Sequence, residues 1–234
     1  MIYGIIVAMD SEMNMLKNEM TEIEETEANG FTFVTGRIGA STVTATRCGI
    51  GKVNAAVGAI TLIDNFRPDA VINTGIAGGT GNGAGILDVV IGTEVGYYDV
   101  WCGPGLPVGQ VQGLPDTFAC DNATFDLDKV RGRDGVKFGL IASGDKFIST
   151  PEDLRAVLAV RPTALAVDME SGAIAQVCYL RSVPFLALRV VSDTPGVPNH
   201  HEQYADFWSL APESTFAMLH ALICLLYTSP SPRD

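Results

Sequence analysis

The chain has 234 residues, of which 47% are apolar and 18% are charged. This composition predicts one domain with a large buried core. The formal net charge of −12 excludes sequence-independent nucleic-acid binding, which needs a basic surface. The sequence has no apolar segment long enough to cross a bilayer. The five cysteines are scattered without a CxxC pair, so we expect a cytoplasmic protein with no metal site.

Taken in chain order, short β-branched runs alternate with helical stretches, a pattern that favours an α/β fold with a mostly parallel sheet. We predict strands at residues 2–8, 31–37, 42–48, 70–74, 89–100, 137–142, 164–167 and 185–191. We predict helices at residues 11–20, 53–66, 151–160 and 170–180, and from 211 towards 226. The acidic stretch from Glu19 to Glu27 is interpreted as a solvated helix face or a turn.

Three further stretches are interpreted as irregular structure. Residues 102–121 are rich in Gly and Pro and are predicted to form a long surface loop. His200 and His201 follow in a loop that carries Pro and Asn, where we expect a mobile lid and no metal site. Residues 227–234 contain two Ser-Pro pairs that cannot continue a helix. We interpret them as a tail that is disordered or foreign to the natural protein, which leaves residues 1–226 as the single predicted domain.

Carboxylates follow three of the predicted strands directly. Glu12 comes after the first strand, Asp168 and Glu170 follow the strand at 164–167, and Asp193 follows the strand at 185–191. In an open α/β sheet, ligands bind beyond the carboxyl ends of parallel strands. The sequence therefore predicts one pocket lined with carboxylates. Taken singly, Asp193 could be a turn residue and Glu170 a charge favoured by a helix dipole.

Two glycine-rich turns follow predicted strands. The first is Gly-Ile-Gly-Lys at 49–52, and the second is Asn-Thr-Gly-Ile-Ala-Gly-Gly at 73–79. Glycines at such turns allow the backbone to approach a ligand closely. Neither turn matches a P-loop or the GxGxxG pattern, so no nucleotide cofactor is expected.

Six motifs occur together and in order along the chain. They are Glu12, Gly-Ile-Gly-Lys at 49–52, Asn-Thr-Gly-x-Ala-Gly-Gly at 73–79, Ser-Gly-Asp-x-Phe-Ile at 143–148, Asp-Met-Glu at 168–170 and Ser-Asp at 192–193. From residue 1 to about 226 the chain resembles the bacterial 5′-methylthioadenosine/S-adenosylhomocysteine nucleosidases of the nucleoside phosphorylase superfamily. The resemblance implies a homodimer of single three-layer α/β/α domains with a mixed, mostly parallel twisted sheet. It also implies hydrolysis of adenine thionucleosides to adenine and a 5-thioribose product, without a cofactor or a metal.

The resemblance also implies roles for individual residues. Asp193 matches the general acid at N7 of adenine, with Ser192 orienting it, and Glu12 matches the residue that activates water. Glu170 matches the carboxylate that binds the ribose hydroxyls, and Met169 the side chain against the sugar. The remaining residues expected to contact the substrate or support its pocket are Phe147 stacked on adenine, the backbone of Ile148 at its edge, Tyr204 near the 5′-thio group, Gly78, Ala77, Ile50 and Arg189.

The chemistry supports these roles independently of the resemblance. Adenine leaves ribose poorly unless its ring is protonated, so an acid is needed that keeps its proton near neutral pH. The sugar passes through an oxocarbenium-like state, which carboxylates stabilise. Asp193 suits the acid, and Glu12 suits the orientation of water from the opposite face of the sugar.

Three alternatives stay open at this point. A nucleoside phosphorylase would use phosphate in place of water, but Asp10 and Glu12 would repel an anion. A futalosine-type nucleosidase would accept a bulkier 5′ substituent. A non-catalytic nucleoside-binding protein could share the fold, because a fold does not determine function.

Overall fold

The computed structural model describes residues 1–125, 127–195, 197, 199–210 and 221. Its strands are β1 (Ile2–Val7), β2 (Thr21–Ala28), β3 (Phe31–Ile38), β4 (Ser41–Arg47), β5 (Ala70–Gly79), β6 (Val89–Tyr97), β7 (Phe118–Ala119), β8 (Val136–Ser143), β9 (Ala164–Asp168) and β10 (Phe185–Asp193). Its helices are α1 (Asp10–Asn18), α2 (Lys52–Phe66), α3 (Asn122–Phe125), α4 (Pro151–Val160), α5 (Ser171–Arg181) and α6 (His200–Leu210), with a 3₁₀ turn at Leu127–Lys129.

The described strands form one mixed sheet in the order β10-β6-β8-β9-β5-β1-β4-β3-β2, with β7 beside β6. Strand β10 also pairs with β5, so the strands β5, β9, β8, β6 and β10 close into a ring. Five strand pairs are parallel and five are antiparallel. The predicted α/β fold with a mixed sheet is confirmed, and the parallel pairs include both neighbours of β1.

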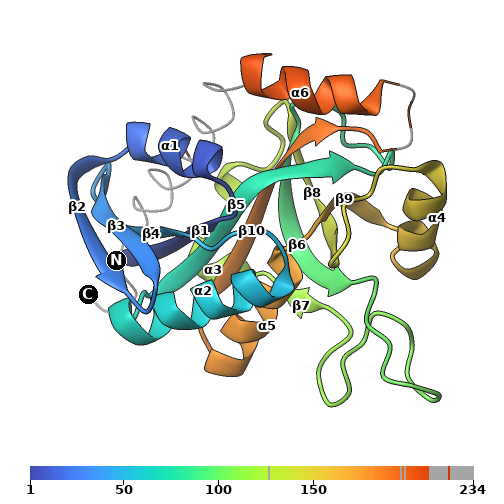
Figure 1. Cartoon of the computed structure of the whole chain (residues 1–234), viewed down its shortest axis with the longest axis horizontal. Coiled ribbons are helices and arrows are strands. Elements are labelled where there is room, and N and C mark those ends of the chain that lie inside the picture. Colours follow the sequence, from blue (N-terminus) through green and yellow to red (C-terminus); the bar gives the residue numbers. More distant parts are fainter. Residues whose placement is uncertain (126, 196, 198, 211–220, 222–234) are drawn as a thin grey trace.

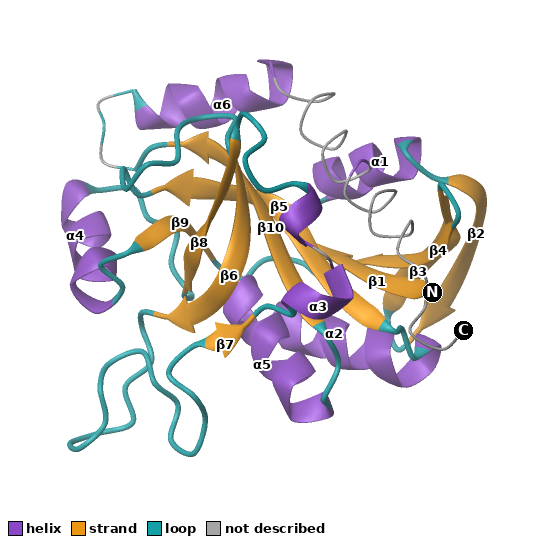
Figure 2. Ribbon diagram, turned by 180° about the vertical axis from the view of Figure 1, so that it is seen from behind, coloured by secondary structure: helices purple, strands orange, loops and turns teal. Residues whose placement is uncertain are grey.

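Helices cover the sheet on two sides. Figure 1 shows α2 and α5 side by side below the sheet, and α1 and α6 above it. The view from behind in Figure 2 shows the same three layers. The core is apolar on both sides of the central strands, and every residue of β10 is buried. A strand covered on both faces reads as a continuous apolar run, which explains why β10 was readily predicted.

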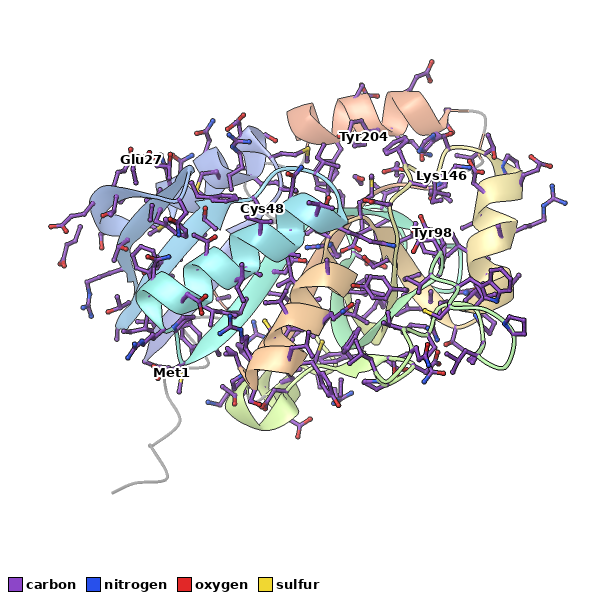
Figure 3. All side chains as sticks on the ribbon, turned by 60° about the horizontal axis from the view of Figure 1, so that its bottom comes forward. Met1, Glu27, Cys48, Tyr98, Lys146 and Tyr204 are labelled. Atoms are coloured by element: carbon purple, nitrogen blue, oxygen red, sulfur yellow. The ribbon has the colours of Figure 1, made fainter. Side chains whose placement is uncertain are left out.

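The acidic stretch forms a strand, so the prediction of a helix face or a turn is wrong. Strand β2 pairs in antiparallel fashion with β3 at the edge of the sheet, and seven of its eight residues are exposed. Figure 3 shows Glu27 at this outer edge, far from Tyr204 and Lys146. Charged side chains on an edge strand oppose pairing with another molecule. Because this strand contributes almost nothing to the core, its sequence shows no regular alternation of apolar and polar residues.

A long loop, residues 98–117, connects β6 to β7 and projects from the molecule in both views. The buried guanidinium of Arg161 holds its base. Nη1 and Nη2 lie 2.7 and 3.0 Å from the carboxylate of Asp116, and Nε donates to the carbonyl of Tyr97 at 2.8 Å. The predicted loop is observed, except that Phe118–Ala119 within it form β7.

The chain after β10 also differs from the prediction. His200 begins helix α6, so it does not lie in a lid loop. The helix predicted from 211 towards 226 lies outside the described residues apart from residue 221, and the tail at 227–234 lies wholly outside them. Within the described part of the chain, none of the helices has the length and apolar character needed to cross a membrane.

Candidate active site

A cavity opens where the carboxyl ends of β1, β5, β9 and β10 meet, beneath α6. Eleven of the twelve predicted site residues line it: Glu12, Ile50, Ala77, Gly78, Phe147, Ile148, Met169, Glu170, Ser192, Asp193 and Tyr204. Arg189 is the exception. The structure therefore brings together segments that lie almost 200 residues apart in the sequence, as the strand-end argument predicted.

Glu12 lies in the first turn of α1 and is 2% exposed. Its Oε2 accepts hydrogen bonds from the backbone N–H groups of Ala8 and Met9 at 2.8 and 3.0 Å. Its Oε1 accepts one from the N–H of Ile76 at 3.1 Å. Burial raises the pKa of the Glu12 carboxyl group, while Arg189 and the three backbone bonds oppose this shift. The side chain is thus fixed by the turn after β1 and by β5, and it lines the cavity.

Glu170 is the N-terminal flanking residue of α5, but its side chain does not cap the helix. Its Oε1 instead accepts a hydrogen bond at 3.0 Å from the backbone of Gly51. Gly51 has φ of 93°, a conformation that favours glycine, which explains the glycine-rich turn. Burial and the Asp168 carboxylate raise the pKa of Glu170 to about 7, against the effect of Arg189. A favourable charge at the start of a helix therefore does not explain Glu170, because its carboxylate bonds the backbone of Gly51 and does not cap α5.

Arg189 lies beneath the cavity and does not line it. Its guanidinium donates to Asp168 Oδ2, to the carbonyl of Leu188 at 3.1 Å and to the side-chain oxygen of Asn73. Burial alone would lower its pKa, but Asp168, Glu170 and Glu12 raise it. The positive charge of Arg189 therefore partly neutralises the negative charges of Asp168, Glu170 and Glu12 from beneath the cavity. This position is compatible with the expected role of Arg189 in supporting the pocket, because its guanidinium is buried among protein groups.

Asp193 is the last residue of β10 and is 3% exposed, so it is not a surface turn residue. The hydroxyl of Ser192 donates to Asp193 Oδ1 and also lies 3.3 Å from the carbonyl of Ala77. On the other side, Nε2 of His200 lies 2.7 Å from Asp193 Oδ2. The hydroxyl of Ser192 thus bonds one oxygen of the carboxyl group, and the imidazole of His200 lies against the other.

Aromatic and apolar side chains cover the open side of the cavity. The ring of Phe147 lies 5.7 Å from the ring of His200 and 5.9 Å, edge-on, from that of Tyr204. The hydroxyl of Tyr204 lies 3.9 Å from the sulfur of Met9. With 47% of its surface exposed, Phe147 has a free face. A planar ring could therefore stack on it.

The predicted site residues leave out eight residues of the site. Seven of them line the cavity and His200 lies against Asp193; the seven are Ala8, Met9, Ile76, Lys146, Val167, Asp168 and Pro195. These seven lie within the quoted motifs or within four residues of them, so proximity in sequence could have indicated them. His200 had no such signal, because its place depends on how α6 packs on β10. Within the described residues, no three His, Cys, Asp or Glu side chains are arranged to hold a metal ion.

The comparisons with known proteins agree with this geometry. Residues 2–223 match the phosphorylase superfamily. A 5′-methylthioadenosine/S-adenosylhomocysteine nucleosidase from Exiguobacterium sp. is 42% identical over 196 residues, which cover 82% of this chain and 84% of the relative. The corresponding nucleosidase from Marinomonas sp. is 37% identical over 228 residues, covering 95% and 98%.

Solved structures are similar over almost the whole chain. The nucleosidase of Streptococcus pneumoniae, solved with a transition-state inhibitor, has a TM-score of 0.90 at 32% identity and covers 97% of this chain and 100% of that one. The nucleosidase of Neisseria meningitidis, in complex with methylthio-immucillin-A, has a TM-score of 0.88 at 34% identity, covering 96% and 99%. The nucleoside phosphorylase-like fold is confirmed, and the chain belongs to the 5′-methylthioadenosine/S-adenosylhomocysteine nucleosidase family of the phosphorylase superfamily.

Proposed function

We propose that this chain hydrolyses the N-glycosidic bond of 5′-methylthioadenosine and S-adenosylhomocysteine, releasing adenine and a 5-thioribose product. One observation supports this most directly: the carboxyl groups of Glu12, Glu170 and Asp193 are buried along a single cavity. Family membership agrees with it. An acid for the base and carboxylates for a cationic sugar are the groups that glycosidic cleavage needs.

The reaction begins with Asp193 as general acid. Its carboxyl group gives a proton to N7 of adenine, and the electrons of the C1′–N9 bond pass to the base as that bond breaks. The sugar then carries oxocarbenium character, which the carboxylates of Glu12 and Glu170 stabilise. Water attacks C1′ and loses its proton to Glu12. Ser192 keeps the plane of the Asp193 carboxyl group fixed through its hydroxyl contact.

The other lining residues position the substrate. The free face of Phe147 stacks on adenine, and the backbone of Ile148 reads the edge of the base. Glu170 accepts hydrogen bonds from the ribose hydroxyls, and Met169 packs on the sugar. Tyr204, from α6, lies towards the 5′-thio substituent. Relatives from Colwellia psychrerythraea and Borrelia burgdorferi were solved with adenine bound, which supports an adenine subsite here.

The charges around the cavity favour water over phosphate as the nucleophile. Among the described lining residues, Lys146 carries the one cationic side chain, and its ammonium group lies 2.5 Å from Asp153. The guanidinium of Arg189 already donates hydrogen bonds to Asp168, Leu188 and Asn73. A phosphate dianion would therefore meet carboxylates without a cation available to hold it.

The direct test measures adenine released from 5′-methylthioadenosine, in phosphate-free buffer and in the same buffer with phosphate added. We expect equal rates in both. Turnover that requires phosphate would identify a phosphorylase, and binding without any adenine release would identify a non-catalytic nucleoside-binding protein.

We also propose that the chain acts as a homodimer. Large apolar side chains are exposed on α2, on α5 beside it and on the projecting loop: Val53, Val57, Tyr179, Leu180 and Trp101. Such a surface is typical of an interface between subunits. Light scattering should give twice the monomer mass, and Leu180→Asp should shift the protein towards the monomer. A fully active monomeric wild type would contradict this proposal.

A cytoplasmic location is the last part of the proposal. The four described cysteines, Cys48, Cys102, Cys120 and Cys178, are free thiols, which agrees with a reducing compartment.

A further inference from the structure

The projecting loop begins with two residues that are bonded to the wall of the active site. The hydroxyl of Tyr98 donates to the carbonyl of Lys146 at 3.2 Å, and Figure 3 shows both residues on the same side of the molecule. Asp99 Oδ2 accepts a hydrogen bond at 2.7 Å from the backbone N–H of Asp145. The start of the loop is therefore attached to the segment 145–148, of which all residues but the first line the cavity.

The same carboxylate also reaches the glycine-rich turn at 49–52. Asp99 Oδ1 lies 2.5 Å from Lys52 Nζ, and the two side chains are only 26% and 22% exposed. Asp145 Oδ1 accepts a hydrogen bond at 3.0 Å from the backbone N–H of Lys52. Three residues from three separate segments thus contact one another in pairs, and we call them the Lys52–Asp99–Asp145 cluster. A partly buried ion pair such as this is screened less by salt than an exposed one.

Helix α2 obtains a charged acceptor at its N-terminus from this cluster. Its capping residue, Gly51, has no side chain to accept a hydrogen bond, and its first turn contains no acidic residue. The first N–H groups of a helix need acceptors from elsewhere, and negative charge is favourable there. The carboxylate of Asp145 supplies both. Because the N–H of Gly51 donates to Glu170, a shift of this turn would also move the carboxylate that is expected to bind the ribose hydroxyls.

The segments joined by the cluster pack without space between them. A Cβ on Gly144 would overlap the ring of Tyr98, and a Cβ on Gly51 would overlap the carboxylate of Asp145. Closely packed segments transmit a displacement from one to the next. The position of the segment 145–148 therefore depends on the cluster.

We propose that Asp99 is a positioning residue for substrate binding, which holds the segment 145–148 against the turn that bonds Glu170. The proposal rests on the proposed function, in which this segment contacts adenine and Glu170 binds the ribose. Asp99 does not itself line the cavity, so it acts through the residues that do.

The groups of the chemical step are held by different contacts. Glu12 accepts hydrogen bonds from the turn after β1 and from β5, and Asp193 accepts one from Ser192. These contacts do not involve the cluster. Loosening the cluster therefore weakens the binding of the substrate and of the transition state alike, which raises KM and leaves kcat almost unchanged.

The experiment measures KM and kcat for 5′-methylthioadenosine in the wild type and two variants. In Asp99→Ala both contacts are lost, so we expect KM to rise about tenfold, the effect of one hydrogen bond to a charged group. We expect kcat to stay within about threefold of the wild type. Asp99→Asn keeps an oxygen for the N–H of Asp145 but not the charge that holds Lys52. This conservative variant should restore part of the affinity, with a rise in KM of about threefold, and it decides alone if the alanine variant does not fold.

Asp116→Ala is the matched control. Asp116 lies near the other end of the same loop and also forms an ion pair, with Arg161, but it is not part of the cluster. Its KM should equal that of the wild type even if its melting temperature falls. An equal rise in KM for Asp116→Ala would overturn the proposal, because the effect would then come from loosening the loop as a whole.

A second measurement does not depend on turnover. The Kd of adenine, measured by calorimetry, should rise in Asp99→Ala by a factor similar to that of KM, because the segment 145–148 lies at the base. Wild-type values of KM and of the adenine Kd in the folded variants of Asp99 would overturn the proposal, and so would a loss confined to kcat. Failure of the proposed function would show separately, as a wild type that releases no adenine from the nucleoside.

Discussion

Nε and Nη2 of Arg189 lie 2.7 and 2.6 Å from the same oxygen, Oδ2 of Asp168. Both side chains are almost fully buried. The other oxygen of Asp168 accepts from the hydroxyl of Ser171 at 2.9 Å, at the start of α5. Arg189 also bonds Asn73, whose amide donates to the carbonyl of Ile6 at 2.9 Å. This ion pair therefore connects β10, β9, α5, β5 and β1 directly beneath the cavity.

Arg189→Met should destabilise the protein strongly. Removing one partner of a buried pair leaves an uncompensated charge, which typically costs about 3–5 kcal/mol. Urea unfolding at pH 7 measures the loss. Arg155→Met is the control, because Arg155 forms an exposed pair with Glu152 whose contribution is about 0–1 kcal/mol. Adding Asp168→Asn to Arg189→Met should recover part of the loss, and equal unfolding midpoints for Arg189→Met and the wild type would refute the role of the pair.

Asp193→Asn should abolish nearly all turnover and leave binding largely intact. The amide keeps the shape of the side chain but cannot supply the proton, and general acid catalysis contributes about 10²–10⁴-fold. Single-turnover kinetics give the rate, and calorimetry with an unreactive analogue gives the affinity. Asp64→Asn, which removes an exposed carboxylate on α2, should change neither. Wild-type rates in Asp193→Asn would show that another group protonates the base.

Gly75→Ala tests the placement of Glu12 without altering a residue that lines the cavity. A Cβ on Gly75 would overlap the carboxylate of Glu12. Glu12 would have to leave its hydrogen bond with Ile76, so we expect kcat to fall about tenfold or more, since a displacement of about 1 Å can cost 10²-fold. Gly85→Ala is the matched control, because the nearest atom to its Cβ would be 3.8 Å away. Equal losses in both variants would indicate a general effect on folding.

The site was largely predictable because its carboxylates have a strong local context. Glu12, Glu170 and Asp193 each follow an apolar strand, and the topology of the sheet then brings strand ends together. The ion pair beneath the cavity was not predictable. Arg189 lies in an apolar run of the sequence, and nothing in the spacing identifies Asp168 as the group that neutralises its charge or Asn73 as a hydrogen-bond partner.

Two of the errors in secondary structure, at β2 and at α6, have a common cause. Strand β2 is defined by its pairing with β3, and its exposed charged residues give no hydrophobic period. Helix α6 follows a segment rich in Pro and Asn, and it is held by tertiary contacts such as Gln203 with Thr194. Both elements depend on contacts with distant or neighbouring segments more than on local propensity, so a local pattern could not identify them.

Glu170→Gln should make the protein more stable at pH 8 while removing activity. The pKa of Glu170 is raised to about 7 in the fold, so the native state binds more protons than the unfolded chain between about pH 4.5 and 7. Stability from this group is therefore lost as pH rises through that range, and above it the buried carboxylate destabilises the fold. The glutamine oxygen can still accept from Gly51 and carries no charge. Unfolding in urea should show a gain on the order of 3 kcal/mol at pH 8 that largely disappears at pH 4.5. A gain independent of pH would contradict the assigned titration, and unchanged turnover would contradict the ribose-binding role.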